Sequence, residues 1–497
     1  MTAALSGENF VAVLALVGIV IVVASLLSGV VEKTGLPQVA IFLALGALLG
    51  PAGFGLFEVT LQSTALRVMT TLALLLVLFS DAITLDMRGI REYRRAAALV
   101  LGPGTLLPAI LLAVLSFYLL GISPARSAIL GAALASTDPV LLRTLLRSPS
   151  LPVDTRLVLR LESGINDVLL LPIVVTAMLV IAAGGSMTVQ DVTSHAAGLF
   201  VLGPLLGAGI GWAGISLLEA IRSRVGVRRD YESLYALGVA FSAYAAAEWV
   251  GGSGFLAAFA AGLTIAMLDV ELCDCFLDYG QATAEMFLLL TFLAFGSSLI
   301  WIGLKVLDVR TVAFSLVAVS IRTIVLLPVL RIARIDRRSQ RLIAWLGPRG
   351  LSSLLLVLLP VFAGVSGAEQ LFAVTCLVVL FSVVLHGGGI ALYLRRTAKG
   401  ERDSLSHGSA PSGAPAKSRE LPQLDETAQD EKITIDEVRA MDARGEPYTI
   451  LDVRTEKAFN ADDLIAANAL RIMPDDAVRR ARQMQLSTRG TLVVYCA

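Results

Sequence analysis

The chain has 497 residues, of which 56% are hydrophobic and 16% are charged, and its mean hydropathy is +0.78. This composition excludes an ordinary soluble domain and is typical of a polytopic membrane protein. The 40 basic and 40 acidic residues give a formal net charge of zero, so there is no basic bias toward nucleic acid and we expect no such partner.

Apolar segments long enough to cross a bilayer follow one another along most of the chain. We therefore predict an all-α transmembrane domain over residues 1–396, embedded in a lipid bilayer as a multi-pass protein. No basic n-region or small-residue cleavage site precedes the first segment, so we expect that segment to be retained. The thirteen or so predicted helices cover residues 9–31, 37–54, 65–85, 96–120, 125–146, 155–183, 193–220, 231–249, 254–270, 281–303, 308–330, 341–363 and 369–394.

Arginines gather in the loops that follow odd-numbered segments. Because basic loops stay in the cytoplasm, this pattern predicts an outside N-terminus and a cytoplasmic C-terminus in the cell inner (plasma) membrane. The clusters are Arg88, Arg91, Arg94 and Arg95; Arg143, Arg147, Arg156 and Arg160; Arg222, Arg224, Arg228 and Arg229; Arg331, Arg334, Arg337, Arg338 and Arg341; and Arg395 with Arg396.

Three carboxylates lie inside two neighbouring apolar segments. Asp138 belongs to the run A-S-T-D-P-V at 135–140, and Glu162 and Asp167 belong to L-E-S-G-I-N-D-V at 161–168. An ionisable group at membrane depth is expensive, so each is a candidate functional residue.

The second run predicts a polar stripe on one helix face. Glu162 and Asn166 are four residues apart, as are Ser163 and Asp167, so in a helix these side chains lie on adjacent parts of one face. Apolar residues take much of the remaining circumference, so we expect the stripe to face the interior of the bundle.

Two predicted segments are interrupted. Pro139 cannot continue a helix, so the break frees backbone carbonyls beside Thr137 and Asp138, and such hard oxygens suit a small monovalent cation. The motif G-P-R-G at 347–350 interrupts the twelfth segment at the corresponding place in the second half. Paired breaks predict two inverted six-helix repeats around a linking seventh segment, with the site where the broken helices meet. The alternative is two unrelated proline kinks.

Arg322 and Arg349 are the charges of the second half. We expect Glu162 to pair with them, because a buried ion must be paired to be tolerable, or else the arginines snorkel to the cytoplasmic face. Three carboxylates against two guanidiniums leave one negative charge. A single proton or a single monovalent cation would neutralise it, and Asp167 could hold one or the other but not both.

The motifs S-T-D-P, E-S-x-x-N-D and G-P-R-G, in this order over about thirteen spans, resemble the electroneutral sodium/proton exchanger branch of the monovalent cation/proton antiporter superfamily. The resemblance implies that Asp167 is the transport carboxylate, that Ser163 and the Thr137–Asp138 region supply oxygens to Na⁺, and that Asn166 fixes the site. It also implies a structural ion pair of Glu162 with Arg322 and Arg349, and a homodimer with a moving core.

The function implied is exchange of a monovalent cation for H⁺, with Na⁺ as the first candidate and K⁺ or Li⁺ as alternatives. No enzyme activity and no cofactor are expected. Electrogenic relatives carry two aspartates where this chain has Asn166 and Asp167, which favours one-for-one, electroneutral exchange and agrees with the single surplus charge.

Other polar residues carry weaker predictions. Asp81 either lines a cytoplasmic funnel or caps a helix end at the interface. His195 and His386 lie near segment ends and are interpreted as packing residues rather than proton relays. The pair Ser297–Ser298 is interpreted as polarity for helix packing.

The remainder of the chain has a different character. Residues 397–430 predict a flexible linker, and 431–497 predict a small α/β fragment with strands at 448–454 and 491–495. The D-V-R and V-V-Y-C motifs resemble part of a rhodanese-type domain, in which Cys496 would begin the anion-binding loop. The chain stops one residue later, so we interpret the fragment as truncated, and as regulatory or vestigial.

Two alternatives remain. One is a membrane-anchored sulfurtransferase, which the missing loop after Cys496 disfavours. The other is a potassium efflux antiporter under control of the tail, which would need a G-x-G-x-x-G unit in its nucleotide-gated form, and the tail contains none.

Overall fold

The chain divides into two compact units, Met1–Ala410 and Pro411–Ala497. The computed structural model describes residues 18, 22, 26, 38–56, 58–85, 94–138, 142, 146, 151–184, 189–225, 229–268, 274–333, 335–390, 438–439, 441–442, 444, 446, 448–453, 466, 469–472 and 491–495.

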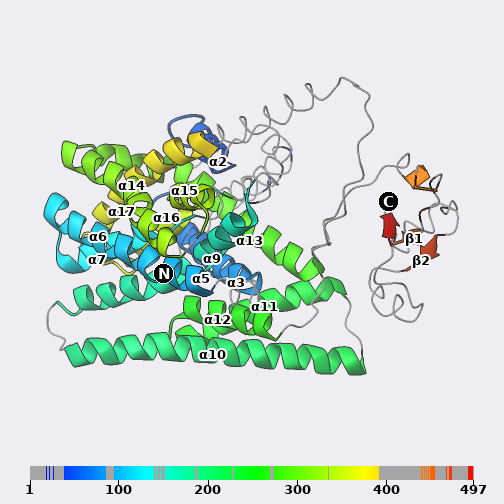
Figure 1. Cartoon of the computed structure of the whole chain (residues 1–497). Helices are drawn as coiled ribbons and strands as arrows, with labels where there is room; N and C mark the ends of the chain where they lie inside the picture. Colours follow the sequence, from blue (N-terminus) through cyan, green and yellow to red (C-terminus); the bar gives the residue numbers. More distant parts are fainter. Residues whose placement is uncertain are drawn as a thin grey trace, which may run out of the picture. The chain divides into compact units, whose positions relative to one another are not determined.

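The regular elements described in the first unit are all helices (Figure 1). They are α2 (Gln38–Leu49), α3 (Thr64–Ile83), α5 (Arg94–Leu101), α6 (Pro103–Leu120), α7 (Pro124–Ala135), α9 (Val153–Ala182), α10 (Val189–Arg224), α11 (Arg229–Trp249), α12 (Gly254–Met267), α13 (Asp274–Ala294), the π-helix η1 (Phe295–Leu299), the 3₁₀-helix η2 (Ile300–Val306), α14 (Val309–Ile332), α15 (Arg337–Trp345), α16 (Leu351–Phe362), α17 (Ala368–Ser382) and the π-helix η3 (Val383–Gly387).

The helices bear out the predicted multi-pass architecture. Within the described residues, seven helical stretches are long and apolar enough to cross a membrane, and α2, α12 and α16 are shorter apolar helices. Each predicted segment from 37–54 onward coincides with one or more helices. The first, 9–31, lies almost wholly outside the described residues.

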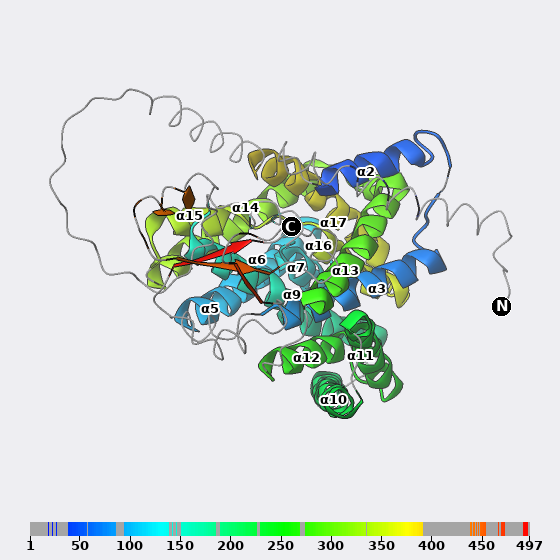
Figure 2. The same cartoon turned by 90° about the vertical axis from the view of Figure 1, so that its right-hand side faces the viewer.

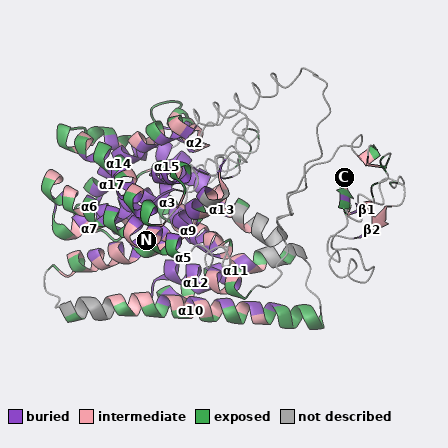
Figure 3. Cartoon of the chain, in the orientation of Figure 1, coloured by how far each residue is buried: buried purple, intermediate pink, exposed green. Residues whose placement is uncertain are grey.

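The helices pack in two groups. One contains α3, α10, α11, α12 and α13, and the other contains α6, α7, α9, α14, α16 and α17. In Figures 1 and 2, α10 lies at one side of the unit next to α11 and α12. Figure 3 shows that α16 is almost entirely buried, whereas most of α10 is half-buried or exposed. The more buried of these two helices, α16, thus belongs to the second group.

A glycine stripe sets the spacing between α10 and α12. A side chain at Gly207 or Gly211 would collide with the backbone of α12, and one at Gly203 with the backbone of Ser253, the N-cap residue of α12. Small residues of this kind let two membrane helices approach closely, where packing rather than a hydrophobic driving force holds them together. The opposite side of α10 exposes apolar side chains such as Leu205 and Trp212, as a lipid-facing surface requires.

Both predicted helix breaks are present. The helix α7 ends at Ala135 and residues 136–138 are not helical, while Pro139 itself lies outside the described residues. In the second half, α15 ends at Trp345 and α16 begins at Leu351, with 346–350 non-helical between them. Proline explains both breaks, since it lacks an N–H and disfavours helical geometry in the residue before it.

The second unit contains a parallel three-stranded sheet in the order β2–β1–β3. The strands are β1 (Tyr448–Asp452), β2 (Leu470–Arg471) and β3 (Thr491–Tyr495). The two predicted strands are thus present and pair directly, with Leu451 opposite Val494. The linker 397–430 and Cys496 lie outside the described residues.

Candidate functional site

The two helix breaks lie against each other. The backbone N–H of Asp138 donates to the carbonyl of Pro348 at 2.9 Å, and the N–H of Leu351 donates to Asp138 Oδ2 at 2.7 Å. Asp138 therefore places its carboxylate at the first turn of α16. The free N–H groups and the positive end of the helix dipole both favour an anion there.

Arg349 caps the C-terminal end of α7, as Asp138 caps the N-terminal end of α16. Its Nη1 donates to the carbonyls of Ala135 and Ser136, at 2.7 and 2.9 Å, where the last turn of α7 has left them without helical partners. A cation at a helix C-terminus is favourable for the same reason that an anion is favourable at an N-terminus. The segment after α7 thus supplies a negative charge to the N-terminus of α16, and the segment before α16 supplies a positive charge to the C-terminus of α7.

Space, rather than an unusual backbone angle, explains the two glycines of G-P-R-G. A Cβ atom at Gly350 would overlap the carboxylate of Asp138, and one at Gly347 would overlap the guanidinium of Arg322. Both contacts belong to buried charged side chains that already have fixed partners. The glycines therefore let the chain pass close to two charges at once.

Glu162 and Arg322 form a complete buried ion pair. Arg322 Nε donates to Oε1 of Glu162 at 2.8 Å and Nη2 to Oε2 at 2.5 Å, and the two side chains are 4% exposed or less. The remaining nitrogen, Nη1, donates to the carbonyls of Ile343 and Ala344 at the end of α15. A bidentate pair with its outer donors satisfied is the form in which buried charges are tolerated.

This geometry corrects the expected grouping of Glu162 with both arginines. Among the described residues, Glu162 pairs with Arg322, and Arg349 binds the carbonyls of α7 instead. The physical reason is that Arg322 already engages both carboxylate oxygens, while the broken α7 offers unpaired carbonyls to Arg349. Neither arginine snorkels, since Arg322 is 2% exposed and Arg349 is fully buried.

Asp167 is the carboxylate that these pairings leave over. It is 3% exposed, and its Oδ1 accepts a hydrogen bond from the Ser136 hydroxyl. The side chain of Ser352, in the first turn of α16, also interacts with it. Its described partners are thus hydroxyl groups, without a guanidinium or ammonium among them. A buried carboxylate without a positively charged side-chain partner is neutralised by binding a proton or a cation.

Oxygen atoms of the neighbouring residues surround this part of α9. Asn166 Nδ2 donates to Thr137 Oγ1 at 2.7 Å, and Asn166 Oδ1 is buried without a hydrogen-bond partner in the structure. The hydroxyl of Ser163 donates to the carbonyl of Arg160 at 3.3 Å. The structure therefore brings together Thr137 and Asn166, two of the predicted site residues, whereas the hydroxyl groups that contact Asp167 are those of Ser136 and Ser352 rather than Ser163.

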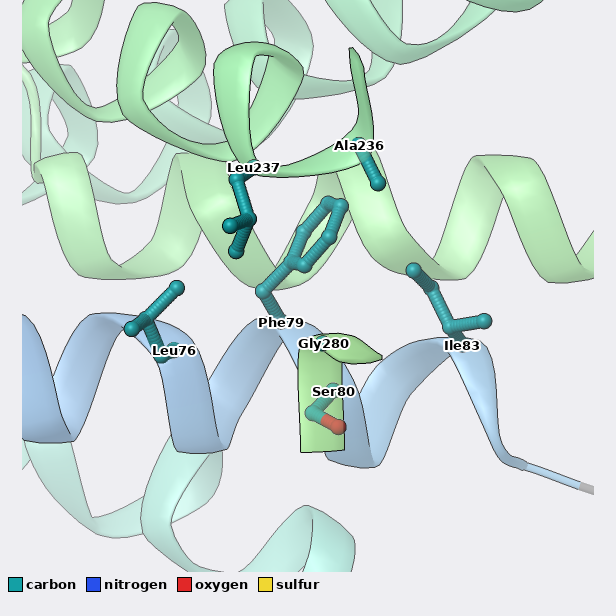
Figure 4. A pocket seen from close by; sticks show the side chains of 7 residues that line it. All are labelled: Leu76, Phe79, Ser80, Ile83, Ala236, Leu237 and Gly280. Atoms are coloured by element: carbon teal, nitrogen blue, oxygen red, sulfur yellow. The ribbon is translucent and has the colours of Figure 1, made fainter. Parts of the chain in front are cut away.

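Asp81 lies on α3 beside the same stretch of α9. A Cβ atom at Gly164 would lie 3.6 Å from the Cβ of Asp81, which places this half-buried aspartate next to the turn between Ser163 and Asp167. The opposite face of α3 borders a small apolar hollow (Figure 4). Its lining residues are Leu76, Phe79, Ser80, Ile83, Ala236, Leu237 and Gly280. Asp81 does not line this hollow, so the hollow is separate from the site.

Several residues near the site escaped the sequence reasoning. Ser136 is the first residue of the S-T-D-P motif but has no predicted role, and Ser352 is the second residue after G-P-R-G. A serine in an apolar segment carries no signal of its own. The interpretation of Ser298 as packing polarity agrees with the structure, where its hydroxyl donates to the carbonyl of Val59 at 2.6 Å. The side chain of His195, on α10, lies outside the described residues.

The chain is similar in sequence to several antiporters. The K(+)/H(+) antiporter NhaP2 of Shewanella sp. (strain ANA-3) is 28% identical over 379 residues, covering 75% of this chain and 65% of the relative. The Na(+)/H(+) antiporter NhaG of Bacillus atrophaeus is 25% identical over 410 residues, covering 77% and 75%. The match to NhaP2 thus spans slightly less than two thirds of that relative's length.

The fold has a counterpart among solved structures. The sodium proton antiporter MjNhaP1 from Methanocaldococcus jannaschii, solved at pH 8, superimposes with a TM-score of 0.61 at 18% identity, covering 77% of this chain and all of that one. This likeness concerns the fold. Residues 18–396, which include both crossed breaks and the buried charges, match the transmembrane sodium/hydrogen exchanger family, and the chain belongs to that family.

Proposed function

We propose that the chain is a secondary antiporter that exchanges a monovalent cation for H⁺ across the membrane. The observation that carries the proposal is the position of Asp167, a buried carboxylate whose described partners are hydroxyl groups. Two other buried carboxylates already have partners, since Glu162 is paired with Arg322 and Asp138 caps α16. Of these three buried carboxylates, Asp167 is the one left for exchange.

The chemistry of exchange follows from this single charge. Moving a bare carboxylate through an apolar barrier is costly, so the site crosses when Asp167 carries either a proton or a cation. The hydroxyl of Ser136, which is bound to Asp167, and the oxygens of Thr137 and Asn166 in the adjoining positions would replace part of the hydration shell of the cation. Because one carboxylate serves both ions, the two compete, and alternating access converts that competition into antiport.

The same reasoning supports electroneutral exchange. One cation for one proton leaves the net charge of the site unchanged in each crossing. Na⁺ is our first candidate, and K⁺ and Li⁺ remain alternatives, since the relatives include both a K(+)/H(+) and a Na(+)/H(+) antiporter. Oxygen ligands serve all three ions, and cavity geometry decides among them.

The central experiment compares Asp167→Asn with the wild type in proteoliposomes, with a pH-sensitive dye and Na⁺, K⁺ or Li⁺ gradients in turn. We expect Asp167→Asn to abolish exchange while the protein remains folded. Asp308→Asn, at an exposed helix N-cap, is the matched control and should exchange normally. Full exchange by Asp167→Asn would refute the assignment.

Further parts of the proposal concern the surroundings of the site. We propose that Asp81 lines the cytoplasmic approach to Asp167, that the C-terminus is cytoplasmic and that the protein works as a homodimer. Cysteine labelling from each side of the membrane tests the orientation, and cross-linking in native membranes tests the dimer. The rhodanese-like interpretation of the tail stays a prediction. A thiosulfate-to-cyanide transfer assay tests the alternative of a membrane-anchored sulfurtransferase, and we expect no transfer.

A further inference from the structure

The end of α17 contacts the broken segment of the second half. Ser382 Oγ accepts a hydrogen bond from the backbone N–H of Arg349 at 2.6 Å and lies 3.1 Å from Nδ1 of His386. All three residues are at most 4% exposed. His386 belongs to the π-helical turn η3, an irregularity that is frequently found at functional sites.

The Ser382 side chain has two hydrogen-bond partners among the described residues. Its oxygen accepts from the backbone N–H of Arg349, and a second hydrogen bond joins its hydroxyl group to Nδ1 of His386, in which the tautomer of the imidazole decides which atom donates. With either tautomer, the bond to His386 restrains the rotamer of the Ser382 hydroxyl group and so holds its oxygen at the N–H of Arg349.

The same turn also contacts the other side of the break. The His386 ring lies 5.9 Å from the ring of Trp345, the last residue of α15, at an interplanar angle of 47°. Three residues further on, a side chain at Gly389 would collide with the Trp345 indole. Ser382 at the end of α17 thus binds Arg349 within the break, while His386 of η3 and the adjacent Gly389 contact Trp345 before it.

Arg349 links the end of α17 to Asp167 through Ser136. Its side chain holds the carbonyl of Ser136, and the hydroxyl of Ser136 is bound to Asp167. We propose that Ser382 and His386 are positioning residues for cation binding, an inference that rests on the proposed antiport at Asp167. They act by fixing the backbone of Arg349, whose side chain keeps Ser136 in place beside Asp167.

The first test removes the link to Arg349. Ser382→Ala should raise the apparent KM for the cation about five- to tenfold, the effect of one lost buried hydrogen bond, and should change the maximal rate much less. Thr375→Val is the matched control. It removes another buried hydroxyl of α17, whose bond goes to the carbonyl of Leu371 within the same helix, and should leave KM unchanged.

The second test separates positioning from packing at His386. Asn presents an amide group, which can accept or donate a hydrogen bond, near the place of Nδ1 and should retain most of the cation affinity, whereas Leu keeps apolar bulk and should raise KM as Ser382→Ala does. The double variant Ser382→Ala with His386→Leu should be no worse than Ser382→Ala alone, because His386 acts through Ser382.

Three outcomes would overturn the inference: equal KM values for Ser382→Ala and Thr375→Val, an additive double variant, or His386→Asn as impaired as His386→Leu. Failure of the proposed function would look different. In that case, the wild type would show no cation-driven proton flux, or Asp167→Asn would exchange normally.

Discussion

Replacing Arg322 by methionine should destabilise the protein strongly. The change removes two charge-assisted hydrogen bonds to Glu162 and two bonds to the carbonyls of Ile343 and Ala344. It leaves the carboxylate of Glu162, 3% exposed, without its cation. Breaking a buried ion pair from one side costs about 3–5 kcal/mol, because the remaining charge is neither hydrated nor paired.

The free energy of unfolding can be measured by denaturant titration in mixed micelles, with fluorescence of the four tryptophans as the signal. Arg331→Met is the matched control, because Arg331 lies on the same helix but is exposed, and it should change stability by no more than about 0.5 kcal/mol. Combining Arg322→Met with Glu162→Gln should recover part of the loss, since no unpaired charge remains.

The reasoning fails if Arg322→Met is no less stable than Arg331→Met. It also fails if the double variant loses the sum of the two single effects, because additivity would mean that Arg322 and Glu162 do not depend on each other.

Three further predictions follow from the described contacts. Gly350→Ala should weaken exchange and cost about 1–3 kcal/mol, because the added methyl group overlaps the Asp138 carboxylate, whereas Gly388→Ala, whose methyl group meets nothing within 4 Å, serves as its control; equal behaviour of the two would contradict the account. The carboxylate of Asp336 caps α15, and the side chain of Ser339, together with the backbone N–H groups of Ser339 and Arg338, holds the pKa of Asp336 below the ordinary value of 3.8. The stabilisation lost in Asp336→Ala is therefore present above that value and disappears as the pH falls through the lower, folded-state pKa, so melting curves of the two proteins should converge in acid. Exchange at Asp167 should be insensitive to a valinomycin-imposed voltage with Na⁺ as the exchanged ion, and acidification should raise the apparent KM for the cation; a voltage-driven proton flux would mean that a second carboxylate titrates.

The sequence by itself determined the architecture. Hydropathy acts over contiguous residues, so the apolar segments predict the helices that the structure describes, and proline acts on its own neighbours, so both breaks could be located from 135–140 and 347–350. The single surplus negative charge could also be predicted from the sequence, because a carboxylate in an apolar segment has to be neutralised wherever its partner lies.

Only the tertiary structure decided which groups neutralise each other. Arg322 and Arg349 have the same chemistry and both follow Glu162 by more than 150 residues, so nothing local could show that Arg322 binds Glu162 while Arg349 binds the end of α7. The hydroxyl groups that contact Asp167 come from Ser136 and Ser352 and not from Ser163 on its own helix. These choices depend on how the two broken helices cross, and that crossing is set by packing between residues far apart in the chain.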